Sequence, residues 1–185
     1  MQVLQRIDPT DDIIIDLVYA REHNFTGRSI YKMPVCYVHK DTAKVIEKTV
    51  ALLKPIGLKL KIFDAFRPME AQQILWNICP DEHCLINPHV GSAHSRGVAI
   101  DATLADHNGN ELDMGSHYDD FSPKSKMGCT TVSNEAQKNR FLLYGVMMTA
   151  GWDHNQEHQW WHFQLPNPEK YRLLNDFMTP EHLMP

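Results

Sequence analysis

Residues 92–104 read SAHSRGVAIDATL and combine the pattern of a buried strand with two side chains that bind metal ions. The second half, 98–104, is apolar apart from two positions, which is typical of a strand in a protein core. An ionised Asp101 inside such a strand is costly to bury unless a partner compensates its charge. Gly97 gives the backbone the freedom to turn His94 back toward that carboxylate. The stretch therefore predicts a buried strand beside a divalent cation.

A second histidine stands in a similar setting near the C-terminus. The sequence QWWHF at 159–163 places His162 among large apolar side chains, on a strand predicted over 160–165. Two imidazoles and one carboxylate suit zinc and leave a fourth position for water, as in hydrolytic zinc sites. Spacing alone leaves other histidines open as ligands, and a histidine in a strand is also compatible with a purely structural role. These other histidines are His117, His154 and His158.

The rest of the chain alternates between strand and helix patterns. The period of the apolar residues, together with capping residues, proline and glycine, sets the expected bounds. Two long polar connections, 80–97 and 105–132, are candidate site loops. Strands are predicted over 13–18, 58–63, 98–104 and 160–165, and helices over 41–54 with Asp41 as N-cap, over 68–78 with Pro68 in the first turn, and from Ser133 or Asn134 to about Gly151.

Composition narrows the class of protein. The chain has 185 residues, of which 43% are hydrophobic and 22% charged, so we expect a single domain over 1–185. A net charge of -5 argues against nucleic acid as a partner. No stretch approaches the ~20 apolar residues of a membrane span. The first residues show no secretory pattern, which favours the cytoplasm, or the periplasm if a leader has been removed. No pattern indicates the oligomeric state.

Four cysteines are spread over the chain. They are Cys36, Cys79, Cys84 and Cys129. The chain is neither short nor cysteine-rich, so we expect reduced thiols. The spacing of Cys79 and Cys84 leaves a local disulfide or half of a metal site as alternatives.

Several short motifs, taken together, resemble one known family. SxHxxGxAID ends at Asp101, DAFRP occupies 64–68 and WWHF occupies 160–163; NFTG at 24–27, Tyr31 and LDMG at 112–115 follow the same order. This combination resembles the zinc D-Ala-D-Ala dipeptidases of the VanX type, which belong with the zinc DD-peptidases and share a fold with the Hedgehog signalling domain. The resemblance covers about residues 11 to 170.

The resemblance implies roles for individual residues. It implies that the zinc ligands are His94, Asp101 and His162. Arg67 matches the arginine that stabilises the transition state, a role that a fixed guanidinium can perform as charge develops on the substrate carbonyl. Asp64 is placed to orient Arg67 or to form a structural salt bridge, and Ser92 and Tyr31 are candidates for holding the substrate.

The resemblance also implies a fold and a reaction. We expect an α+β fold with a small, mostly antiparallel sheet flanked by helices and one zinc ion in a cleft on the sheet. The expected reaction is metal-assisted hydrolysis of D-alanyl-D-alanine, used in recycling of wall precursors or in removing the dipeptide that glycopeptide antibiotics target.

One residue departs from the family pattern. The family motif is Glu-x-x-His, whose glutamate is the general base, and here Gln159 precedes His162 by three residues. Glutamine cannot accept a proton, and positioned acid–base catalysis contributes ~10²–10⁴-fold, so we expect impaired turnover. Three interpretations remain open: an engineered substitution, a natural variant that binds without turnover, or a base supplied by Glu157 or His158.

Other functions compete with the dipeptidase. A DD-carboxypeptidase would act on longer stem peptides, and the segment 79–90 is the place where the two activities would differ. Gln159 also fits a non-catalytic module that binds zinc and peptide. A purely structural zinc domain is disfavoured, because structural zinc is usually closed by four protein ligands.

Overall fold

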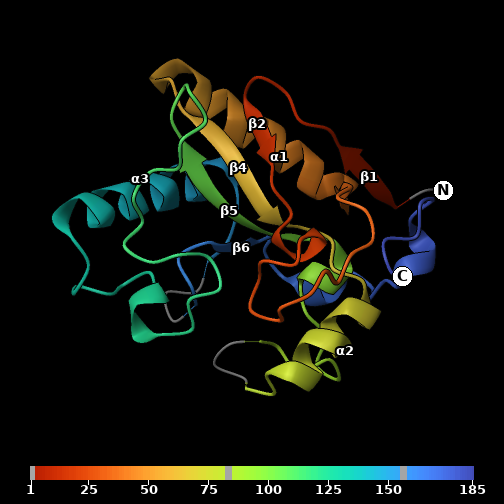
Figure 1. Cartoon of the computed structure of the whole chain (residues 1–185). Coiled ribbons are helices and arrows are strands. Elements are labelled where there is room, and N and C mark those ends of the chain that lie inside the picture. Colours follow the sequence, from red (N-terminus) through yellow and green to blue (C-terminus); the bar gives the residue numbers. More distant parts are fainter. Residues whose placement is uncertain (1–2, 82–84, 155–157) are drawn as a thin grey trace.

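A four-stranded sheet forms the centre of the computed structural model, which describes residues 3–81, 85–154 and 158–185 (Figure 1). β4 and β5 are its central strands, and β4 pairs with β2 in parallel while β5 pairs antiparallel with β4 and β6. A separate antiparallel pair joins β1 and β3. The expected α+β class with a mostly antiparallel sheet is confirmed. The strands are β1 (Leu4–Ile7), β2 (Ile13–Ile15), β3 (Cys36–His39), β4 (Lys59–Asp64), β5 (Ala99–Ala105) and β6 (His162–Gln164).

The described residues form three α-helices beside the sheet. α1 (Lys40–Leu53) and α3 (Asn134–Ala150) pack against each other and cover one face, whereas α2 (Met69–Ile78) lies beyond the end of β4 (Figure 1). Ser133 caps α3 by accepting a hydrogen bond from Ala136 N, and Gly151 ends it with φ +110°, as the sequence predicts. No helix in the described part of the chain has the length and apolarity needed to cross a bilayer.

Some predicted helix starts were displaced by one or two residues. His39, not Asp41, is the N-cap of α1, because its Nδ1 accepts a hydrogen bond from Asp41 N at 3.1 Å. Pro68 is the N-cap of α2 rather than a residue of its first turn. Asp is the more common N-cap type, but the His39 side chain is the one that accepts from a free amide of the first turn, whereas Pro68 makes no side-chain capping bond.

Strand lengths were overestimated at both ends of the chain. The strand expected over 13–18 ends at Ile15, and a 3-10 turn, η1 (Val18–Ala20), follows it. The strand expected from 160 begins at His162, because Trp160 and Trp161 are buried in the preceding turn. Apolar residues that are buried outside the sheet gave the same pattern as strand residues. β1 and β3 were not predicted.

A β-bulge near the end of β4 shifts its register against β5. Pairing runs regularly as far as Ile62 with Ala102 and resumes with Asp64 opposite Asp101, so that Phe63 is an additional residue. In a regular ladder Phe63 would lie opposite Asp101. The bulge therefore brings two acidic residues to the same position on neighbouring strands.

The core explains why the central strand reads as a nearly continuous apolar run. All seven residues of β5 are buried. Four of them belong to a hydrophobic cluster that includes residues of α1, α3 and both tryptophans before β6, namely Ala99, Ile100, Ala102 and Leu104. Cys36, Cys79 and Cys129 are free thiols in the described part of the chain, and Cys84 lies outside it. The expectation of reduced cysteines therefore applies to three of the four.

Candidate metal centre

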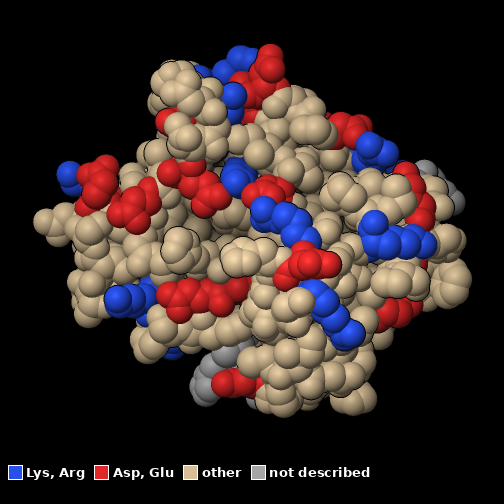
Figure 2. Space-filling model, in the orientation of Figure 1, with Lys and Arg blue, Asp and Glu red and all other residues tan. Residues whose placement is uncertain are grey.

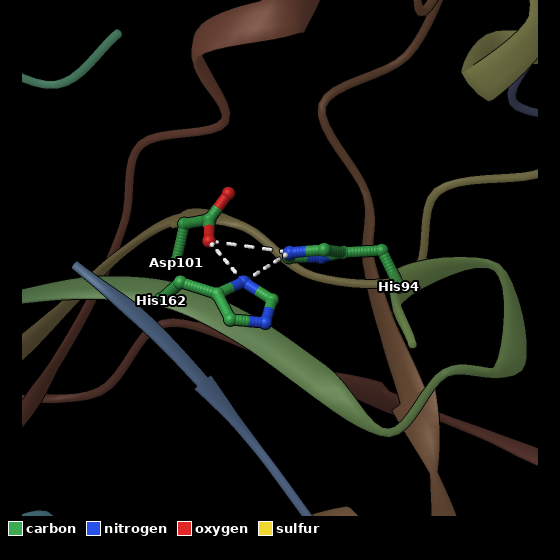
Figure 3. A group of neighbouring side chains, drawn as sticks. All are labelled: His94, Asp101 and His162. Atoms are coloured by element: carbon green, nitrogen blue, oxygen red, sulfur yellow. Dashed lines mark hydrogen bonds and ion pairs between the residues drawn. The ribbon is translucent and has the colours of Figure 1, made fainter. Parts of the chain in front are cut away.

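Three side chains from separate elements converge where β5 and β6 begin. His94 lies on the 3-10 turn η3 (His94–Arg96) just before β5, Asp101 lies on β5, and His162 is the first residue of β6. The strand register pairs Asp101 directly with His162. Figure 3 shows the two imidazoles and the carboxylate pointing toward a common point. Neighbouring strands and one turn thus bring together the residues singled out in the sequence.

The ligand atoms lie close enough to share one cation. His94 Nε2 and His162 Nδ1 are 3.1 Å apart, and Asp101 Oδ1 lies 3.2 Å from the first and 3.1 Å from the second. His94 Nδ1 donates to Ala65 O at 2.8 Å, so its Nε2 presents a lone pair when the ring is neutral. Two imidazole nitrogens and a carboxylate oxygen grouped this closely can hold a metal ion.

The turn that carries His94 is fixed by its neighbours. Ser92 Oγ accepts a hydrogen bond from His94 N at 3.2 Å. Gly97 ends the turn with φ +71°, and its carbonyl accepts from His39 N at 2.7 Å. A Cβ atom at Gly97 would lie 2.9 Å from His39 N and 2.9 Å from a methyl group of Leu4, so glycine is required by space as well as by conformation. Ser92 thus contacts the backbone of His94.

Arg67 is buried beside the three converging residues. Its Nε and Nη2 contact Asp64 Oδ2 at 2.8 and 2.7 Å, and Nη2 lies 3.4 Å from Asp101 Oδ2. Tyr31 donates its hydroxyl to the other oxygen of Asp64 at 2.9 Å. Burial by itself would lower the pKa of Arg67, but Asp64 raises that pKa well above its ordinary value. The guanidinium therefore stays charged and fixed in orientation.

The surroundings of Asp101 favour its ionised form. Burial would raise the pKa of this carboxyl, but the neighbouring His94 and His162 hold it well below its usual range. Tyr118 donates its hydroxyl to Asp101 Oδ2 at 3.0 Å, and burial raises the pKa of Tyr118 well above 10, so this hydroxyl keeps its proton. One carboxylate oxygen thus faces the histidines while the other is occupied by donors.

Comparison with known proteins assigns the chain to a family. The D-Ala-D-Ala dipeptidase model of the M15 peptidases matches residues 4–180. The chain belongs to this peptidase family. It is 43% identical over 173 residues to a D-alanyl-D-alanine dipeptidase of Escherichia coli strain K12, an alignment that covers 91% of this chain and 89% of the relative. A D-alanyl-D-alanine dipeptidase of Enterococcus faecium is 30% identical over 181 residues and is covered to 89%. The family suggested by the sequence is thus confirmed, as is its class of peptidase.

Sequence reasoning missed part of this dipeptidase site. The Tyr19 ring lies 5.3 Å from the Arg67 guanidinium, and its hydroxyl donates to Asp119 Oδ1 at 2.9 Å. Asp119 Oδ2 is shielded from solvent and has no hydrogen-bond partner among the described residues. Tyr118, next to it, contacts Asp101. These residues lie in turns and loops without periodicity, so their convergence gave no signal in the sequence beyond the HYDDF run at 117–121.

The alternative histidines lie outside the group of three. His154 is buried, but its Nδ1 contacts the backbone oxygen of His162 at 2.6 Å. His158 packs its ring edge-on against His162 at 5.5 Å between centroids, and burial lowers its pKa to about 4. His117 is exposed. Among the described residues, the one group of His, Cys, Asp or Glu side chains placed to share a metal ion consists of His94, Asp101 and His162.

Gln159 belongs to the turn that leads into β6. Its backbone pairs with Lys126, and its carbonyl accepts a hydrogen bond from His162 N at 3.2 Å. The backbone at Gln159 is therefore fixed relative to His162. Glu157, the other candidate base, lies outside the described residues.

Proposed function

We propose that this chain is a zinc-dependent D-Ala-D-Ala dipeptidase whose turnover is limited by Gln159. The observation that carries the proposal is the convergence of His94, Asp101 and His162 beside the buried Arg67. The ligand atoms are 3.1–3.2 Å apart. A tetrahedral ion with bonds of about 2.0–2.1 Å separates its ligands by about 3.3–3.4 Å. Zinc therefore fits with a small adjustment, and when bound it supplies Lewis-acid chemistry at the scissile carbonyl.

Arg67 supplies the second positive charge at the reacting carbonyl. A guanidinium held by Asp64 needs little reorganisation as negative charge develops on the substrate oxygen. Tyr31 and Asp64 lie behind the arginine, with exposed fractions of 1% and 0%. Their contacts support a role in holding Arg67, and the contact of Ser92 supports a role in holding His94.

The free amino group of a dipeptide has a matching partner in Asp119. Among the described residues, one carboxylate oxygen of Asp119 has no hydrogen-bond partner, and the residue adopts a left-handed backbone conformation, φ +62°, which residues other than glycine rarely adopt. An ammonium group is the natural partner for a shielded carboxylate. A longer peptide carries an amide at that position instead. Asp119 therefore favours a dipeptidase over a carboxypeptidase that acts on stem peptides.

Gln159 stands where the family motif has its proton acceptor. The amide is close to glutamate in size and still forms hydrogen bonds, but it takes no proton at accessible pH. Positioned bases contribute ~10²–10⁴-fold to rate, and we infer a deficit of that order in this chain. Whether the residue is natural or engineered does not change this consequence.

The deciding experiment measures release of D-alanine from D-Ala-D-Ala by zinc-loaded protein. We expect the Gln159→Glu variant to be about 100-fold or more faster than the unaltered chain, and the exposed control Gln73→Glu to leave the rate unchanged. Equal rates would show that another residue is the base. If both proteins bind zinc and neither cleaves the dipeptide, the dipeptidase proposal fails and a binding module becomes the better interpretation.

A second substrate separates the two peptidase activities. A tripeptide that ends in D-Ala-D-Ala has the same scissile bond but no ammonium group next to it. We expect the Gln159→Glu variant to leave this tripeptide uncleaved. Equal cleavage of both substrates would favour the carboxypeptidase.

A further inference from the structure

We propose that Gln72 is a positioning residue that locks the free edge of the Arg67 guanidinium and ties it to the loop before His94. The inference rests on the proposed function, because it concerns how the arginine is held for the reaction. Gln72 lies on α2 and was not singled out in the sequence. Its side chain is 1% exposed.

Both ends of the Gln72 amide are engaged. Its Oε1 accepts a hydrogen bond from Arg67 Nη1 at 3.0 Å, and its Nε2 donates to Ile86 O at 2.7 Å. α2 starts directly after Pro68, and Gln72 N donates to Pro68 O at 3.0 Å, so the first helical turn brings Gln72 back beside the arginine. A carboxamide both donates and accepts, and the site uses both properties.

The guanidinium has few donors left once these contacts are made. Nε and Nη2 point to Asp64 and Asp101, and one Nη1 hydrogen goes to Gln72. Of the five N–H groups of arginine, the second Nη1 hydrogen is therefore the one that Asp64, Asp101 and Gln72 do not engage. It lies on the edge that Gln72 fixes. Without Gln72, the guanidinium would be held only through Nε and Nη2, by Asp64 and Asp101.

The other end of the amide fixes a segment that leads to the metal centre. Ile86 opens a turn in which Asn87 O accepts from Val90 N at 2.9 Å and from Gly91 N at 3.2 Å. Ser92 follows immediately, and its Oγ accepts the hydrogen bond from His94 N. Gln72 therefore connects the arginine to the stretch that delivers one of the three metal-binding side chains.

Two substitutions at Gln72 separate the two hydrogen bonds. Gln72→Met keeps an unbranched side chain of similar length and loses both. Gln72→Glu keeps an acceptor for Arg67 but cannot donate to Ile86 O. The matched control is Gln73→Met, because Gln73 is the next residue of α2, is exposed and hydrogen-bonds Asn77 on the helix surface. All variants are measured at full zinc loading and again without zinc.

The first readout is the Kd of a phosphinate analogue of D-Ala-D-Ala, whose tetrahedral group resembles the transition state. We expect about tenfold weaker binding for Gln72→Met, the scale of one lost hydrogen bond to a charged group, and near-normal binding for Gln72→Glu and Gln73→Met. In the Gln159→Glu background, kcat should fall with Gln72→Met while KM stays the same.

The second readout is amide hydrogen exchange of residues 85–91 in the zinc-free protein. We expect faster exchange in both Gln72 variants and no change in Gln73→Met. Normal analogue binding together with normal exchange in Gln72→Met would overturn the inference. If the unaltered chain neither binds the analogue nor cleaves the dipeptide, the dipeptidase proposal fails, and the exchange contrast still tests the link between Gln72 and Ile86.

Discussion

Asp64 and Asp101 lie opposite each other on β4 and β5, and the Arg67 guanidinium lies between their carboxylates, 2.7 Å from the first and 3.4 Å from the second. Two buried negative charges at paired positions are normally destabilising. Here one cation lies on the chain itself, and the ring nitrogens of His94 and His162 mark the place of another. The two charges therefore make the centre depend on an arginine as well as on a metal.

Lysine cannot replace Arg67 in this arrangement. Arg67→Lys keeps a positive charge but loses the planar fork that contacts Asp64, Asp101 and Gln72. We expect zinc content to stay at one per chain and kcat for D-Ala-D-Ala to fall by about 10²-fold or more, the effect of losing one oxyanion donor, when both are measured in the Gln159→Glu background. The exposed Arg28→Lys is the control. An unchanged kcat would exclude Arg67 from stabilising the transition state.

Zinc content tests the ligand set directly. Alanine at His94, Asp101 or His162 leaves two ligands, too few for a stable site, because zinc needs four-coordination with at least three protein groups in hydrolytic enzymes. Elemental analysis after dialysis should show loss of stoichiometric zinc in each variant. The exposed His89→Ala should keep it. Full metal content in two of the three variants would contradict the assignment.

Gly57 and Gly97 share one backbone conformation, so alanine substitutions at the two positions distinguish the cost of backbone strain from the cost of a steric clash. Gly57 has φ +70° with no atom within 4 Å of an added Cβ, whereas Gly97 has φ +71° with His39 N at 2.9 Å. Alanine at Gly57 should lower the free energy of unfolding by about 1–2 kcal/mol through conformation alone. Alanine at Gly97 should cost a further ~1–3 kcal/mol through overpacking. Urea denaturation measures both, and equal losses would show that the space around Gly97 is not limiting.

Asp119 gives the stability of the zinc-free chain a dependence on pH. Burial raises the pKa of this carboxyl from 3.8 to about 7. The folded state thus binds the proton more tightly than the unfolded state, so the contribution is fully present below about pH 4 and is lost as pH rises through about 7. The neutral Asp119→Asn variant should lack it. Relative to that variant, the unaltered chain should lose stability between pH 5 and pH 8.

Urea midpoints at those two pH values provide the measurement for Asp119. The neighbouring Asp120→Asn is the matched control and should behave like the unaltered chain. A difference between the unaltered chain and Asp119→Asn that is the same at pH 5 and pH 8 would contradict the raised pKa.

Local signals explain which parts of the fold could be predicted. The helix that begins after Ser133 has a capping side chain at one end and Gly151 at the other, and both act within a few residues. The run around Asp101 is long and apolar enough to identify a strand. β1 and β3 are short strands that pair across about thirty residues of chain, and such pairing is determined by tertiary contacts that no local pattern records.

The candidate site also contains residues that the sequence predicted and residues that it did not. Residue type and spacing indicated His94, Asp101 and His162 as a possible metal site, whereas Arg67 was identified through the resemblance of its DAFRP motif to the family. The structure brings all four together. Gln72 resembles any polar residue on a helix, and its burial depends on how α2 packs against the loop at Ile86. The position of Asp64 opposite Asp101 depends on one additional residue in β4, which periodicity cannot detect.

That additional residue also determines how the chain can change in length. A deletion of Phe63 would turn the β4–β5 ladder into a regular one and leave Asp64 opposite Asp101, at the expense of the stack between Phe63 and Tyr118. A deletion between Asp64 and Arg67 would not be tolerated in this way, because it would move the arginine away from the carboxylates of Asp64 and Asp101. Natural relatives and engineered variants that are shorter here should therefore carry their gap at Phe63.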